Sequence, residues 1–205
     1  MMEQKKIFVF DFDGTLTKRD TFVEFIRFVH GDKATLIGFL KNLHVLLLMK
    51  AGIIGRGRAR RMVFSYFFAG MTEEMFDAHC LRFATAKKNL LRPKAVKKLD
   101  SLTAERQHVI IVTESITRWV QPFFAAYIIH PGFKVTGTEI AVDNGKLTGR
   151  FANKNCTGTE KVKHIKALFP ERDDCFIVAY GDGKGDIEML DYADEGHYKP
   201  FRGRR

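Results

Sequence analysis

The chain has 205 residues, of which 45% are hydrophobic and 28% charged, proportions that are ordinary for a soluble globular protein. This length can bury a sizeable core, either as one domain or as a core with a smaller insert. The net charge of +10 at pH 7 favours anionic partners, namely phosphorylated metabolites, nucleic acid or an anionic membrane surface, although a charge that only aids solubility is the alternative.

The cysteines and the N-terminus indicate a reducing compartment. The three cysteines are far apart and form no C-x-x-C pair, so neither a zinc site nor a disulfide framework is indicated. The apolar run near the N-terminus, residues 7–10, is too short for the core of a signal peptide. We therefore expect a cytoplasmic protein.

The first predicted strand, residues 7–10 (IFVF), leads directly into residues 11–15 (DFDGT). Its β-branched and aromatic residues are typical of a short buried strand. Carboxylates at the carboxyl end of such a strand lie where open α/β sheets bind ligands. Asp11 and Asp13 would repel each other and lose hydration there unless a cation or a proton compensates. Taken alone, the motif also fits a solvated acidic turn.

Residues 18–88 contain no convincing strand and predict a helical insert. Asp20 or Thr21 can cap its first helix, which we expect to end at Gly31. Residues 34–54 are the most apolar part of the chain, but polar residues interrupt them at positions 41, 42 and 44. We expect this segment to fill the core of the insert, and contact with a membrane surface is the alternative.

The remaining pattern alternates apolar strands and helices. Strands are predicted at 109–112 and 175–180, helices at 93–104, after Gly158 and after residue 186, and Ser115 is expected to cap a further helix. Residues 139–151 resemble a hairpin, which we expect on the edge of the sheet. This alternation predicts an α/β fold with a doubly wound parallel sheet and a helical cap inserted after the first strand.

Polar side chains end three of the predicted parallel strands, which places them at one edge of the sheet. So many carboxylates in one crevice need a cation, and ligands that are all oxygen favour Mg²⁺ over zinc. Lys161, near the start of the helix after Gly158, is the candidate for holding an anionic group against the metal. The strand-end residues are Asp11, Asp13, Thr113, Ser115, Asp182 and Asp186.

Four motifs in this order resemble the haloacid dehalogenase (HAD) superfamily. They are D-x-D-G-T at 11–15, an apolar strand ending in Thr113, the helix-borne Lys161, and G-D-x-x-x-D at 181–186. The insert and the segments 143–149 and 179–182 are similar to the phosphoserine phosphatase-like branch, subfamily IB. The resemblance spans almost the whole chain. It implies a Rossmann-like core, residues 1–17 and 89–205, and a cap, residues 18–88, that determines substrate specificity.

The resemblance also implies roles for the strand-end residues. Asp11 would be the nucleophile and form an aspartyl-phosphate. Asp13 would protonate the leaving group and then activate water, and an acid at this position favours phosphatase chemistry over carbon–halogen cleavage. Thr113 and Lys161 would hold the phosphoryl oxygens. The Mg²⁺ ligands would be Asp11, the backbone carbonyl of Asp13, and Asp182, with Asp186 in the second shell or bound through water.

Two positions depart from the family pattern. Glu114 stands where relatives usually carry a small residue, and we expect it to face solvent; the alternative is that it binds a cationic group. Lys184 adds a positive charge between Asp182 and Asp186. We expect a surface lysine, with pairing to Asp186 or to substrate as the alternative.

Candidate substrate contacts come from the cap and from the second strand. Asp20 stands where phosphoserine phosphatases keep an acid for the substrate amine, and an N-cap explains it equally well. Arg60 belongs to an arginine cluster that can bind a carboxylate, a second phosphate or a lipid headgroup. Glu114 is the third candidate. The other arginines of the cluster are Arg56, Arg58 and Arg61.

We therefore expect a Mg²⁺-dependent phosphatase that acts on a small, phosphoserine-like organic phosphate. The apolar segment beside the arginines also resembles bacterial phosphatidylglycerophosphate phosphatases, so a lipid phosphate at the inner membrane surface is the alternative substrate. A basic binding module with vestigial acids is an alternative of another class. No nucleic-acid partner is expected, because the sequence has no RNA-reading aromatic motif and no helix-turn-helix signature.

Overall fold

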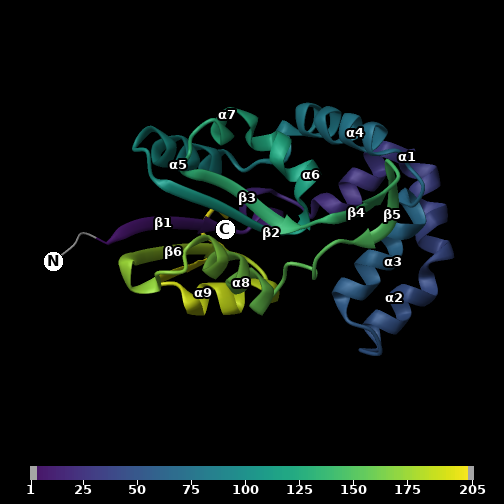
Figure 1. Ribbon diagram of the computed structural model, residues 1–205. Helices are drawn as coiled ribbons and strands as arrows, with labels where there is room; N and C mark the ends of the chain where they lie inside the picture. Colours follow the sequence, from purple (N-terminus) through teal and green to yellow (C-terminus); the bar gives the residue numbers. More distant parts are fainter. Residues whose placement is uncertain (1–3, 203–205) are drawn as a thin grey trace.

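The computed structural model describes residues 4–202, and a five-stranded parallel sheet forms its centre (Figure 1). The strand order is β3-β2-β1-β6-β7, and every neighbouring pair is parallel. This arrangement confirms the predicted α/β fold. The strands are β1 (Lys5–Phe10), β2 (His108–Ile116), β3 (Phe133–Thr138), β6 (Cys175–Gly181) and β7 (Glu195–Tyr198).

Helices cover both faces of the sheet, and the central strands accordingly carry apolar side chains on both sides. Along β1, Phe8 and Phe10 pack into one hydrophobic core, and Ile7 and Val9 pack into the other. Figure 1 shows α5 and α7 on one face and α8 and α9 on the opposite face. The helices that follow the insertion are α5 (Pro93–Ala104), α6 (Thr117–Val120), α7 (Ala125–Ile128), α8 (Thr159–Leu168) and α9 (Ile187–Tyr192).

A helical insertion follows β1, as predicted. It contains α1 (Thr21–Lys41), α2 (Leu43–Lys50), α3 (Arg56–Phe68) and α4 (Glu73–Ala86). Asp20 caps α1, because its side chain accepts a hydrogen bond of 2.8 Å from the backbone N–H of Phe22. Gly31 interrupts α1 with φ 78° and ψ 166° but does not end it, since the helix resumes and continues to Lys41.

An aromatic cluster joins the insertion to the rest of the fold. The ring of Phe25 on α1 lies 4.8 Å from Trp119, 5.2 Å from Phe83 and 5.5 Å from both Phe68 and Phe76, measured between ring centroids. All five side chains are buried. Trp119 belongs to α6, so the contact anchors the insertion against the helix that follows β2.

A Phe25→Ala variant should test how much this cluster stabilises the protein. Truncating a fully buried phenylalanine leaves a cavity, so we expect the free energy of unfolding to fall by about 3–5 kcal/mol. Urea denaturation followed by fluorescence measures the change. The matched control is Val23→Ala on the exposed side of the same helix, which should cost no more than about 0.5 kcal/mol. Equal effects of the two substitutions would show that the cluster adds no stability.

The prediction that residues 34–54 fill the core of the insertion is wrong. Leu36, Leu40 and Leu47 are 62%, 61% and 56% exposed, and Val45 is the only large apolar residue of the segment that is fully buried. The cause is Gly38, where a Cβ atom would come within 2.1 Å of the Phe67 ring on α3. Because α1 approaches α3 on its small-residue side, the leucines face outward. Within residues 4–202, no helix combines the length and apolarity needed to cross a bilayer.

The hairpin formed by β4 (Ile140–Asp143) and β5 (Lys146–Phe151) does not extend the edge of the sheet, contrary to expectation. It forms a separate antiparallel pair that binds the α3–α4 turn. The backbone N–H of Gly70 donates to the carbonyl of Leu147 at 2.8 Å, and the N–H of Leu147 donates to Met71 at 2.9 Å. The hairpin therefore stabilises the insertion.

Two further details differ from the sequence prediction. Ser115 is not a helix cap, because β2 continues to Ile116 and no side chain caps α6. β7 was not predicted, since its exposed sequence EGHY lacks the apolar character of the other strands.

Short helical turns complete the chain: η1 (Phe12–Leu16), η2 (Lys88–Leu90), η3 (Gln121–Phe124), η4 (Arg172–Asp174) and η5 (Lys184–Asp186).

Candidate active site

The site begins where β1 ends, in the turn that carries Asp11 and Asp13. Gly14 follows them with φ +81°, a left-handed conformation that glycine adopts without strain. A Cβ atom at Gly14 would lie 2.6 Å from a carboxylate oxygen of Asp182. Glycine therefore serves two purposes here: it turns the chain, and it lets the end of β1 approach the acid that follows β6.

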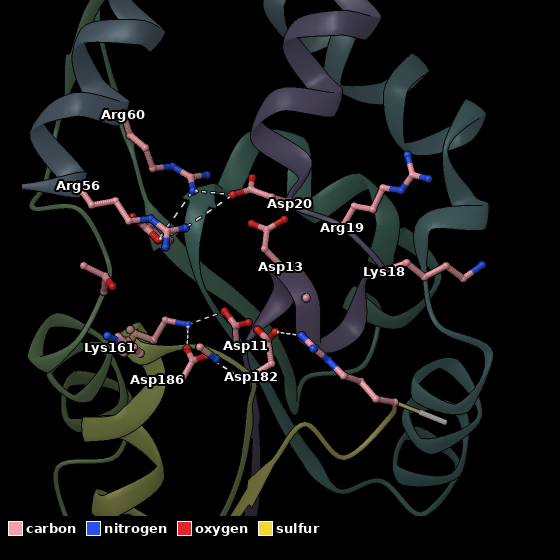
Figure 2. A pocket seen from close by; sticks show the side chains of 17 residues that line it. Asp11, Asp13, Lys18, Arg19, Asp20, Arg56, Arg60, Lys161, Asp182 and Asp186 are labelled. Atoms are coloured by element: carbon pink, nitrogen blue, oxygen red, sulfur yellow. Dashed lines mark hydrogen bonds and ion pairs between the residues drawn. The ribbon is translucent and has the colours of Figure 1, made fainter. Parts of the chain in front are cut away.

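Lys161 holds the segments that follow β1 and β6 against β2, and Figure 2 shows its bonds to Asp11 and Asp186. Its Nζ donates to Asp11 at 2.6 Å, to Asp186 at 2.7 Å and to the carbonyl of Val112 at 3.0 Å. The residue is only 1% exposed. Burial alone would lower the pKa of Lys161, but the carboxylates of Asp11 and Asp186 raise it above its usual range, so the lysine stays charged.

Asp11, Asp182 and Asp186 form an acidic triad. Each offers a carboxylate oxygen, and the three oxygens lie within 4.8 Å of one another. Asp186 is held in place, because one of its oxygens accepts the backbone N–H groups of Asp182 and Gly183 at 3.0 and 2.9 Å. Asp182 forms an ion pair with Arg202.

The triad fits a divalent cation. Burial raises the pKa of Asp11 to about 7; Asp186 adds to this effect and Lys161 opposes it. One lysine thus does not fully compensate the buried carboxylates, and a cation would favour their ionised forms. Oxygen donors alone are the set that Mg²⁺ prefers. The cluster includes Asp186, for which the family resemblance implied a place in the second shell or a contact through water.

Asp13 has different partners from Asp11. Its Oδ1 accepts from the backbone N–H and the hydroxyl of Thr21, both at 2.7 Å, and its Oδ2 accepts from the hydroxyl of Ser115. Burial raises the pKa of Asp13 to about 6, with Asp20 adding and Arg60 opposing. Sequence reasoning placed Ser115 at this edge of the sheet but did not identify its bond to Asp13. The role of Thr21 was missed.

Charged residues from the insertion form the outer wall of the site (Figure 2). The buried guanidinium of Arg60 donates to Asp20 at 3.2 Å and to Ser115 at 3.3 Å, and it lies 3.8 Å from Glu114. Arg56 is 3.5 Å from Glu114 and 3.7 Å from Asp20. Two arginines on α3 therefore bridge one acid at the start of α1 and one acid on β2.

The expectation that Glu114 faces solvent is wrong. Its side chain is 13% exposed, and one carboxylate oxygen accepts a hydrogen bond of 2.9 Å from Asn155. The arginines from the insertion compensate its charge. The alternative, that Glu114 binds a cationic group, therefore describes the structure better, and the cationic groups are protein side chains. The adjacent Thr113 is fully buried, accepts the backbone N–H of Ser115 at 3.0 Å, and is not among the described residues that line the cavity.

A cavity of about 340 Å³ opens between the triad and the arginines. Its size suits a small ligand. Lys184 is exposed at the edge of the cavity, as expected of a surface lysine. Asp186, the alternative partner for Lys184, bonds to Lys161 and to backbone N–H groups. Four further residues line the cavity and were not predicted, because none of them belongs to a recognisable sequence motif. They are Lys18, Arg19, Thr157 and Arg202.

The chain is similar to several known proteins. The chain is 32% identical to protein CicA of Caulobacter vibrioides over 206 aligned positions, which cover 100% of this chain and 90% of the relative. A crystal structure of a protein of unknown function from Bordetella pertussis superposes with a TM-score of 0.76 at 18% identity, covering 92% of this chain and 86% of that one. A substrate-bound phosphoserine phosphatase gives 0.64 at 19% identity, covering 93% and 83%.

At these levels of identity the two solved structures establish the fold alone. The family assignment rests on sequence: residues 8–191 match the haloacid dehalogenase-like hydrolases. The match extends from β1 to α9 and so includes the acidic triad, Lys161 and the insertion. The chain belongs to the haloacid dehalogenase-like hydrolase family.

Proposed function

We propose that this protein is a Mg²⁺-dependent phosphatase that hydrolyses a phosphomonoester through an aspartyl-phosphate on Asp11. One observation carries the proposal: two carboxylates, the buried Asp11 and the half-buried Asp13, have separate environments although they are two positions apart in the sequence. Asp11 lies against Lys161 and the acidic triad. Asp13 turns toward Thr21 and Ser115. Separate environments allow two carboxylates to perform different chemical steps.

In the first step, an oxygen of Asp11 attacks phosphorus, and the bond from phosphorus to the leaving oxygen breaks. Asp13 donates its proton to that leaving oxygen, which its raised pKa of about 6 favours. In the second step, Asp13 accepts a proton from water while the water oxygen attacks phosphorus. The bond between phosphorus and the Asp11 oxygen breaks, which regenerates the Asp11 carboxylate and releases inorganic phosphate. Lys161 orients Asp11 and offsets negative charge.

Asp11 and Asp182 would hold the Mg²⁺ ion with the backbone carbonyl of Asp13, and Asp186 supports the site. When bound, the ion would supply positive charge that stabilises the phosphoryl oxygens. The ion pair of Asp182 with Arg202 supports this assignment, because a cationic group already lies against this acid. The guanidinium must give way when a metal binds.

An Asp182→Asn variant should weaken the metal site without removing the nucleophile. We expect the Mg²⁺ concentration for half-maximal turnover to rise by about 10- to 100-fold, because a neutral amide is a poorer ligand than a carboxylate. A Mg²⁺ titration of turnover measures the shift. Asp191→Asn, an exposed aspartate on α9, is the control. An unchanged titration for Asp182→Asn would remove Asp182 from the metal site.

For the substrate we propose a small organic phosphate of the phosphoserine type. Two features support this: the cavity is small, and its outer wall pairs Asp20 and Glu114 with Arg56 and Arg60. Such a wall can match a ligand that carries an ammonium and a carboxylate. The fold is shared with phosphoserine phosphatases, one of which was solved as a phospho-aspartyl intermediate analogue.

A lipid phosphate is the second candidate. The observation that favours it is the outward-facing leucine surface of α1 and α2, close in sequence to Arg56. On this alternative the arginines would bind a lipid headgroup at the membrane surface.

Turnover of p-nitrophenyl phosphate with and without Mg²⁺ tests the activity. We expect turnover that a chelator abolishes and Mg²⁺ restores. A panel of phosphoserine, sugar phosphates, nucleotides and phosphatidylglycerophosphate then separates the two substrate classes. If no phosphomonoester is hydrolysed in the presence of Mg²⁺, the proposed function is wrong, and the non-catalytic binding module becomes the better description.

A further inference from the structure

The outer surface of the insertion carries a row of exposed leucines. Leu36 and Leu40 belong to the second half of α1, and Leu43 and Leu47 belong to α2. All four are exposed, and we call them the leucine stripe. Figure 1 shows α1 and α2 on the side of the insertion that faces away from the sheet.

The stripe occupies one helix face. Its members are spaced i, i+4, i+7 and i+11, which places them on one side of a helix. Hydrogen bonds continue across the join between α1 and α2, from the N–H of Asn42 to Gly38 at 3.0 Å and from the N–H of Leu46 to Asn42 at 3.2 Å. The buried residues of the segment occupy the opposite face: Thr35, Gly38, Asn42 and Val45. The apolar face thus points out and the small or polar face points in.

The charges around the stripe are mostly basic; one exposed acid, Asp32, precedes Leu36 by four residues and pairs with Arg27 at 2.6 Å. Residues 33–72 contain no aspartate and no glutamate. Lys33, Lys41 and Lys50 are exposed along the same two helices, and Arg58 and Arg61 are exposed on α3. Lysine beside an outward apolar helix face can extend its ammonium group to anionic headgroups while its alkyl chain lies on apolar surface. This surface therefore complements a partner that presents anionic groups at its surface and apolar chains beneath them.

We propose that the leucine stripe and its lysines dock this protein peripherally on an anionic lipid bilayer. A second copy of the chain fits the surface less well, because a symmetric contact would bring the basic residues of 33–72 together, and the neighbouring acid, Asp32, already pairs with Arg27. The exposed leucines project from one helix face, which is the geometry of a helix lying in a membrane interface.

Docking would place the cavity close to the membrane. The loop 51–55 connects α2 to Arg56, and Arg56 reaches Glu114 and Asp20 at the cavity. Ile53 in this loop is also exposed and adds to the apolar surface. The inference goes beyond the proposed phosphatase activity, since binding to lipid requires neither Asp11 nor a substrate.

Co-sedimentation with vesicles tests the proposal. The wild-type protein should bind vesicles of phosphatidylglycerol and phosphatidylcholine at low salt, bind less at high salt, and bind phosphatidylcholine alone weakly. A Leu40→Ser/Leu47→Ser variant should bind the anionic vesicles at least about tenfold more weakly. Each of Lys41→Gln and Lys50→Gln should weaken binding about fivefold.

Matched controls separate the stripe from general effects of surface changes. Leu81 on α4 is 61% exposed, the same fraction as Leu40, so Leu81→Ser should leave vesicle binding unchanged. Turnover of p-nitrophenyl phosphate and the thermal unfolding midpoint should be the same in the wild type and in the Leu40→Ser/Leu47→Ser variant. Failure of the docking proposal is thus distinguishable from failure of the phosphatase proposal.

Three results would overturn the docking proposal. The first is no binding of the wild type to anionic vesicles at low salt. The second is equal binding by the wild type and the double leucine variant. The third is a dimer, detected by light scattering, that the leucine substitutions dissociate while vesicle binding is absent; that result would assign the surface to a second copy.

Discussion

An Asp11→Asn variant is expected to lose phosphatase turnover by at least about 10⁴-fold, because it loses the attacking group itself. Asparagine keeps the shape of the side chain, but its amide cannot form the acyl phosphate. The substitution also removes one carboxylate from the acidic triad and one acceptor from Lys161. Steady-state turnover of p-nitrophenyl phosphate at saturating Mg²⁺ measures the loss.

The control for this variant is Asp191→Asn, which removes an exposed carboxylate on α9 that is not among the residues lining the cavity. It should retain wild-type turnover. Thermal unfolding of both variants checks that the fold survives. Wild-type turnover by a folded Asp11→Asn variant would show that another group attacks phosphorus.

An Asp13→Asn variant is expected to lose about 10²- to 10⁴-fold in turnover of an alkyl phosphate, because the leaving alkoxide loses its proton donor. p-Nitrophenolate leaves without protonation, so with p-nitrophenyl phosphate the first step should persist. The second step should then be slow, since Asp13 no longer accepts a proton from water. Rapid mixing should show a burst of p-nitrophenolate followed by slow turnover.

The two substrates provide the internal control for Asp13. A variant that was merely misfolded, or had lost its metal, would fail with both substrates and show no burst. Such an outcome in a folded, Mg²⁺-saturated Asp13→Asn variant would contradict the proton-transfer role. The contacts with Thr21 and Ser115 make folding of this variant a fair expectation, because the asparagine oxygen can still accept from Thr21.

The convergence of the acids could be predicted because it follows from topology. Asp11 and Asp182 follow parallel strands, β1 and β6, that lie side by side in the sheet. Parallel strands end at the same edge, so a short motif after each strand is enough to bring the side chains together. The sequence also places Lys161 at this edge, but as a group that would hold an anionic ligand against the metal; its ion pairs with Asp11 and Asp186 were not predicted.

The surroundings of Glu114 could not be predicted in the same way. The arginines that compensate it lie on α3, far away in the sequence, and their approach depends on how the insertion packs over the sheet. Arg202 raises the same difficulty, because no local pattern indicates that a residue near the C-terminus reaches Asp182.

The exposed leucines show a different limit of sequence reasoning. Apolar content alone indicated that residues 34–54 are buried. Which face of a helix packs inward depends on close approach as well as on hydropathy, and at Gly38 the absence of a side chain allows α1 to contact the Phe67 ring. The leucines on the opposite face are therefore left without a partner within the part of the chain that the structure describes.

The most direct test of the account is to detect the phosphoryl group on Asp11. The Asp13→Asn variant, mixed with p-nitrophenyl phosphate and Mg²⁺ and quenched in acid, should yield a peptide containing Asp11 that is heavier by one phosphoryl group. The Asp11→Asn/Asp13→Asn variant should yield none. Burst kinetics with the phosphoryl group on another residue, or turnover with no phosphorylated peptide at all, would contradict the assignment of Asp11 as nucleophile.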